Sequence, residues 1–116
     1  MSHTTVAELA LWQQHGFDFR VIDVRKAAAR QAQGSSIAGA AWRDPAGWLD
    51  WKDEVAAAAA NRPWPVLLVC AHGHELSQGL AAALAAMGVD ARWLRGGLAG
   101  WQAEGGAVVA LPHEDG

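Results

Sequence analysis

Cys70 is the side chain with the clearest potential for covalent chemistry in this sequence. It is the only cysteine among 116 residues, and it directly follows the apolar run Val66–Val69. If that run is a strand and a helix follows it, backbone N–H groups and the positive end of the helix dipole favour an anion at Cys70. A thiol in such a field ionises more easily, and the thiolate is the nucleophilic form. The alternative is an inert core cysteine, since free cysteines are often buried.

The segment after Cys70 predicts a cradle of main-chain N–H groups. A loop of this length between a strand and a helix can turn its N–H groups inward, and Gly73 permits the tight curvature. We expect Ser77 to open the helix, which gives a seven-residue loop from Cys70 to Leu76. The predicted substrate-binding residues are the rest of this loop and the first helical residue: Ala71, His72, Gly73, His74, Glu75, Leu76 and Ser77.

His72 and His74 leave three interpretations open. Together with Cys70 they supply metal-ligand types, but one tight loop turns them in different directions and offers no fourth ligand. We therefore expect no metal. The two imidazoles could instead line the pocket and donate a proton near neutral pH, or face solvent without a role.

Strand-like and helix-like segments alternate along the chain. Strands are predicted at 19–24, 66–69 and 91–94, with a glycine-punctuated loop over 35–42 that enters a short strand, and helices at 6–15, 26–33, 45–60, 77–87 and 98–103. The first helix has the capping-box spacing of Thr5 and Glu8. This alternation predicts an α/β fold with a parallel sheet covered by helices on both faces.

Length and composition exclude several classes of protein. With 116 residues, 52% of them hydrophobic, the chain predicts a single domain over residues 1–116. No apolar run reaches the roughly 18 residues of a membrane span, and the net charge of −3 gives no basic surface for nucleic acid. The N-terminus shows no leader pattern, so we expect a cytoplasmic protein. We also expect it to be a monomer or a weak dimer. We expect Trp48, Trp51 and Trp64 to be core residues rather than a surface for a partner.

The order and spacing of several motifs resemble the rhodanese domain. The motifs are Ile22-Asp23-Val24-Arg25, Gly34 with Ile37-Ala38-Gly39-Ala40, Val66-Leu67-Leu68-Val69-Cys70 with His72-Gly73, and Leu94-Arg95-Gly96-Gly97-Leu98-Ala99-Gly100-Trp101. The resemblance covers a core from about residue 4 to 105 and leaves 106–116 as a polar C-terminal tail.

The resemblance implies a five-stranded parallel sheet with helices on both faces and a sulfurtransferase activity. Cys70 would accept a sulfane sulfur from thiosulfate or a persulfide donor and pass it to a small-molecule or protein acceptor. This is a two-step covalent mechanism for which one cysteine suffices, so no cofactor is expected. Asp23 and Arg25 match the Asp-x-Arg motif of the family, which implies structural support beside the active site.

Two departures from the family pattern keep other functions open. A seven-residue loop resembles that of rhodanese-fold phosphatases and arsenate reductases, which place an arginine at its last position. Leu76 occupies that position here and removes the bidentate donor. The loop also carries Glu75 instead of a cation, so persulfide donors remain as open as thiosulfate. The last alternative is a catalytically weak module that carries sulfur or docks a partner.

Overall fold

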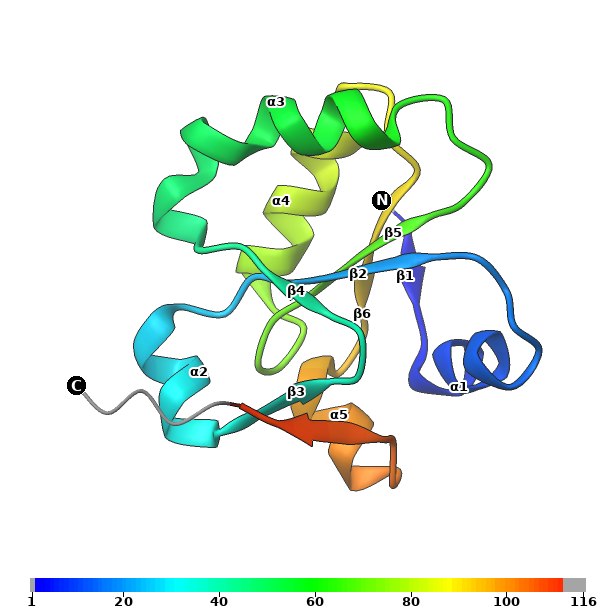
Figure 1. Cartoon of the computed structure of the whole chain (residues 1–116), viewed down its shortest axis with the longest axis vertical. Helices are drawn as coiled ribbons and strands as arrows, with labels where there is room; N and C mark the ends of the chain where they lie inside the picture. The colour runs from blue at the N-terminus through cyan, green and yellow to red at the C-terminus, as the bar shows by residue number, and fades with distance from the viewer. Residues whose placement is uncertain (1, 112–116) are drawn as a thin grey trace.

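Five parallel strands form the central sheet of the computed structural model, which describes residues 2–111 (Figure 1). Their spatial order is β1 (His3–Thr4), β6 (Ala91–Leu94), β5 (Val66–Val69), β2 (Arg20–Asp23) and β4 (Ala41–Trp42). Leu68 of β5 pairs with Ile22 on one side and Trp93 on the other, so β5 is the central strand. The predicted five-stranded parallel α/β fold is confirmed.

Helices cover both faces of the sheet. One face packs against α3 (Trp48–Ala59) and α4 (Glu75–Ala86), and the other against α1 (Val6–Gln14) and α5 (Gly97–Ala103). A short helix, α2 (Ala27–Gln33), follows β2, and a 3-10 turn, Pro45–Gly47, leads into α3. Successive side chains of a strand point to opposite faces, and β5 therefore supplies both cores. No helix within residues 2–111 is long and apolar enough to cross a bilayer.

The first helix begins as its sequence predicts. Thr5 is the N-cap residue, its hydroxyl accepts from the backbone N–H of Glu8, and the Glu8 carboxylate accepts from the backbone N–H of Thr5. This reciprocal pair satisfies two N–H groups that would otherwise lack partners at the helix start. β1, which comes just before it, was not predicted, because two residues are too short to show a strand pattern.

Tryptophan side chains fill the α3–α4 face, as expected. Trp51 is buried, and its ring meets that of Trp48 edge-on with centroids 4.8 Å apart. Trp48 and Trp64 are partly buried against the same cluster. The prediction that these three residues belong to the core is confirmed.

The C-terminal segment differs from the polar tail predicted for 106–116. β7 (Val108–Ala110) pairs antiparallel with β3 (Ser35–Ile37) in a second, two-stranded sheet. The indole N–H of Trp101 donates to the carbonyl of Ala107 at 2.9 Å, which ties the chain to α5 just before β7. The expected tail is thus ordered through Leu111, and its remainder, 112–116, lies outside the described residues.

Candidate active site

Cys70 lies at the carboxyl end of the central strand. Val66, Leu68 and Cys70 belong to the core cluster on the α3–α4 face, as alternation along an extended chain requires. The Cys70 residue is 7% exposed, so the thiol lies at the end of the core and not on an open surface.

A buried hydroxyl contacts the sulfur. Ser77 Oγ lies 3.1 Å from Cys70 Sγ, and Ser77 is fully buried. The same hydroxyl lies 3.4 Å from the carbonyl oxygen of His74. A hydroxyl can donate one hydrogen and accept others, so Ser77 can accept from a thiol while donating to His74, or rotate and donate to a thiolate. Ser77 thus stabilises either form of Cys70.

The carbonyl groups at the start of the loop face α5. The carbonyl oxygen of Cys70 accepts from Leu98 N, and that of Ala71 accepts from Ala99 N, both at 2.9 Å. In a trans peptide the N–H points opposite to the C=O, so the N–H groups of Ala71 and His72 point away from α5. The N-terminal end of α5 therefore fixes the orientation of the first peptide planes after Cys70.

Within the described part of the chain, the N–H groups of residues 71–77 have no hydrogen-bond acceptor. None of the hydrogen bonds formed among residues 2–111 uses one of them as its donor. The first N–H groups of a helix have no partner within the helix, and here the loop before α4 adds further free donors. Such a series of unpaired donors is suited to binding an anion.

Two glycines let the loop press against the turn between β6 and α5. Gly73 has φ +71°, and a Cβ on it would lie 2.6 Å from the carbonyl oxygen of Leu94 and 2.7 Å from Gly96 N. Gly97 has φ +61°, and a Cβ on it would lie 2.5 Å from Cys70 O. No side chain fits at either position, so the backbone of the cysteine loop lies directly against the turn between β6 and α5.

The predicted seven-residue loop is wrong. Helix α4 begins at Glu75, with His74 as its N-cap residue, so it starts two residues before the predicted Ser77. The residues before Ser77 show no capping pattern that would have revealed the earlier start, since His74 caps α4 without a side-chain hydrogen bond. The hydroxyl of Ser77 contacts Cys70 and His74. Because α4 begins at Glu75, Leu76 lies in the first helical turn and is not the last loop residue.

The polar side chains of the loop point outward. His72, His74 and Glu75 are exposed, and the two imidazole rings lie 6.0 Å apart. No group of three or more potential ligands in the described chain could hold a metal ion. The segment from Cys70 to Ser77 contains no Arg or Lys, so its capacity for anions comes from the main chain.

Asp23 and Arg25 form a buried ion pair at the end of β2. Each residue is 2% exposed, and Arg25 donates to both carboxylate oxygens, with a shortest distance of 2.7 Å. The carboxylate also accepts from Ser36 Oγ at 2.9 Å, and Arg25 reaches the carbonyl of Ser35. The pair thus joins β2 to β3 beside the strand that carries Cys70.

The sequence did not indicate one contact that braces the loop. Gln78 Nε2 donates to the carbonyl oxygen of Gly73 at 3.0 Å. The position of Gln78 one residue after Ser77 gave no pattern from which this bond could be inferred.

The comparison with known families agrees with the geometry. The model of the rhodanese-like domain matches residues 5–104, which include all the strands of the parallel sheet except β1. The chain belongs to the rhodanese-like domain family. No curated protein matches it.

Solved rhodanese-like structures share the fold at low sequence identity. A rhodanese-related protein from Thermoplasma volcanium has 24% identity and a TM-score of 0.74, over 94% of this chain and 98% of that one. A rhodanese-like domain protein from Staphylococcus aureus has 26% identity and a TM-score of 0.71, over 87% and 91% of the two chains. A protein of unknown function from Rhodopseudomonas palustris, described as a possible tyrosine phosphatase, has 20% identity and a TM-score of 0.77, over 94% and 85%. These similarities show the fold that the chains share.

Proposed function

We propose that this rhodanese-like domain is a sulfurtransferase in which Cys70 carries the sulfur as a persulfide. The observation that supports it most is the series of free N–H groups at residues 71–77 next to a thiol that contacts Ser77. A thiolate and an anionic persulfide both need such donors. The proposal thus assigns one role to the whole loop.

The first step transfers sulfur to Cys70. The thiolate of Cys70 attacks the outer, sulfane sulfur of the donor, and an S–S bond forms as the donor's own S–S bond breaks. With thiosulfate, the bonding electron pair leaves on sulfite, and the protein holds Cys70–S–S⁻. The charge moves from the sulfur of Cys70 to the outer sulfur, and a series of free N–H groups offers donors to both positions.

The second step returns the cysteine to its starting state. A thiophilic acceptor, such as cyanide or a thiol, attacks the outer sulfur, and the electron pair of the broken S–S bond returns to Cys70. Cyanide then leaves as thiocyanate. Ser77 can donate to the thiolate that re-forms, because its hydroxyl lies 3.1 Å from Cys70 Sγ. Sulfur enters and leaves at the same oxidation level, so the cycle needs no cofactor.

One observation favours a second candidate, a carrier with weak turnover. Cys70 is 7% exposed, which slows access by bulky donors and acceptors. A persulfide held in such a site would be protected from adventitious thiols and would be released to a docked partner. This candidate predicts a stable persulfide with little thiosulfate–cyanide turnover.

The loop chemistry argues against phosphatase or arsenate reductase activity. Transfer of a phosphoryl or arsenate group calls for a bidentate donor to the equatorial oxygens, which arginine supplies. No arginine occurs between Cys70 and Ser77.

Thiosulfate–cyanide turnover of the wild type and of Cys70→Ala and Cys70→Ser tests the proposal. We expect thiocyanate formation by the wild type and its complete loss in both variants, each with an unchanged melting temperature. Thiocyanate formation that persists in Cys70→Ala would contradict the proposal. Hydrolysis of an aryl phosphate that disappears in Cys70→Ser would assign phosphatase chemistry instead.

A further inference from the structure

Two cationic side chains of the described chain have no partner. The sequence has nine Lys and Arg residues. Within residues 2–111, seven of them donate to a carboxylate or carbonyl oxygen or lie in an ion pair with one: Arg20, Arg25, Arg30, Arg43, Lys52, Arg62 and Arg92. The side chains of Lys26 and Arg95 make no such contact with the described residues, and both residues are exposed.

Both unpaired cations lie at the edge of the sheet that holds Cys70. β2 and β6 are the two strands that flank β5. Lys26 follows β2 as the N-cap residue of α2, and Arg95 directly follows β6. Because the three strands are parallel, their carboxyl ends lie side by side, where ligands of such sheets bind. The strand that ends at Cys70 therefore has an unpaired cation after each of its neighbours.

The main chain of Arg95 is fixed against the cysteine loop. A Cβ on Gly73 would lie 2.6 Å from Leu94 O and 2.7 Å from Gly96 N, the atoms on either side of Arg95. Arg95 N donates to Thr4 O at 3.0 Å. The backbone of Arg95 thus has a set position beside the loop, while its side chain is free to meet a ligand.

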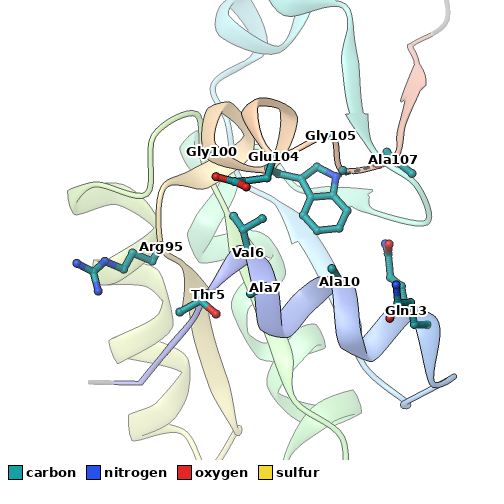
Figure 2. A pocket seen from close by; sticks show the side chains of 13 residues that line it. Thr5, Val6, Ala7, Ala10, Gln13, Arg95, Gly100, Glu104, Gly105 and Ala107 are labelled. Carbon is teal, nitrogen blue, oxygen red and sulfur yellow. Dashed lines mark hydrogen bonds between the residues drawn. The ribbon is translucent and has the colours of Figure 1, made fainter.

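Figure 2 shows where the Arg95 side chain extends. Arg95 borders a groove between α1 and α5, whose lining also includes Thr5, Gly100 and Glu104. The Arg95 guanidinium points away from Glu104 and out of the groove. Glu104, the acidic residue in the lining of this groove, therefore does not pair with the Arg95 guanidinium.

We propose that Lys26 and Arg95 attract small anionic sulfane-sulfur donors, of which thiosulfate is the simplest, to Cys70. They supply the positive charge that the loop from Cys70 to Ser77 lacks. The inference rests on the proposed sulfur transfer at Cys70. It is needed because the whole chain carries a net charge of −3 and the exposed Glu75 adds a negative charge at the loop, so an anion approaches only where cations concentrate locally.

Alkylation of Cys70 tests this field without any sulfur chemistry. Iodoacetate carries a negative charge and iodoacetamide none, so the ratio of their rate constants reports the field at the thiolate. We expect Lys26→Gln and Arg95→Gln each to lower this ratio about threefold in 0.1 M salt, and the double variant about tenfold, within the range of steering by charge clusters. The effect should fade in 1 M salt, where charges are screened over about 3 Å.

Arg62→Gln is the matched control. It removes the same charge from an exposed residue, but Arg62 precedes β5 at the opposite edge and donates to the carbonyl of Ala58. We expect a change in the ratio of less than about 1.5-fold, because more than one Debye length of roughly 10 Å separates the two edges in 0.1 M salt. A double variant with the same ratio as Arg62→Gln would overturn the inference.

The KM for thiosulfate then tests the assignment of the donor. We expect the double variant to raise it about a hundredfold with little change in kcat, because thiosulfate carries two negative charges where iodoacetate carries one. An altered alkylation ratio with an unchanged KM would overturn the assignment of small anionic donors. If sulfur transfer itself is absent from the wild type, the proposed function fails while the alkylation ratio still measures the field.

Discussion

The two ends of the parallel sheet differ in whether their hydrogen-bond donors have partners. At the amino ends of the strands, Arg20 pairs with Asp18 and stacks over Trp64, and Arg92 pairs with Asp90. At the carboxyl ends, the N–H groups of residues 71–77 have no acceptor among residues 2–111. N–H groups without a protein acceptor can donate to a bound anion, so their concentration at one edge marks a place where a ligand can bind.

The carboxyl edge also contains the most deeply buried ion pair of the described chain. This edge therefore holds two different parts, a structural pair whose hydrogen bonds are made and a loop whose N–H groups are free. Asp23 and Arg25 are buried and fully hydrogen-bonded, whereas Cys70 lies beside donors that are free. The Asp23–Arg25 pair holds the backbone beside the cysteine loop in place. The free N–H groups of the loop can then bind an anion without a rearrangement of the loop, which is what pre-organised binding requires.

The largest expected effect comes from breaking the buried pair. Asp23→Asn leaves the Arg25 guanidinium buried without a counter-charge, and we expect it to lower the free energy of unfolding by about 3–5 kcal/mol in urea denaturation. Asp90→Asn at the exposed amino edge is the comparison, and we expect about 0–1 kcal/mol. Equal losses of unfolding free energy in Asp23→Asn and Asp90→Asn would contradict the proposed difference between the carboxyl and amino edges of the sheet.

A side chain at Gly73 should separate the loop from the turn behind it. Gly73→Ala places a Cβ against Leu94 O and Gly96 N, and we expect a loss of about 2–4 kcal/mol with loss of sulfur transfer. Gly34→Ala has a similar positive φ of +71° but nothing within 4 Å, so it reports the backbone strain alone, about 1 kcal/mol. The expectation fails if the two melting temperatures fall together.

The hydroxyl of Ser77 should matter more to reactivity than to folding. Ser77→Ala removes the side-chain partner of Cys70 Sγ, and we expect iodoacetamide at neutral pH to alkylate Cys70 about tenfold more slowly, since a hydrogen bond to a charged group contributes about 1.5 kcal/mol. Gln78→Ala, which removes the brace on Gly73 but no contact with sulfur, is the control. An unchanged alkylation rate in Ser77→Ala would show that the hydroxyl does not stabilise the thiolate.

The smallest effect is expected at Glu75. Glu75→Lys replaces an exposed negative charge at the loop, and we expect thiosulfate turnover to rise two- to fivefold at low salt and to return toward the wild-type value in 1 M salt. A rate that is unchanged at both ionic strengths would mean that the Glu75 carboxylate faces away from the approaching donor.

The sequence predicted the central strand, the helices and the position of Cys70 because these depend on local patterns. Val66–Val69 is a continuous apolar run, and Thr5 with Glu8 is a capping box, so each could be recognised within a few residues. β1 and β7 were missed because their strands exist only through pairing with distant residues, β6 and β3. Pairing partners of this kind leave no local pattern.

The start of α4 was misplaced for a related reason. The sequence placed Ser77 as the first helical residue, but the helix begins at Glu75 after His74, an N-cap residue that makes no side-chain hydrogen bond and so gives no local sign of a helix start. The two unpaired cations could not be recognised either, because only the folded chain shows which of its Lys and Arg side chains have acidic partners. The sequence showed only that Lys26 and Arg95 each follow a predicted strand.

Mass spectrometry of the protein after incubation with a sulfane donor tests the central claim most directly. Reduced protein is treated with thiosulfate, freed of donor and digested. We expect a gain of about 32 Da, one sulfur atom, confined to the peptide that contains Cys70 and reversed by cyanide. A folded protein that gains no mass with thiosulfate or with a low-molecular-weight persulfide would contradict the account.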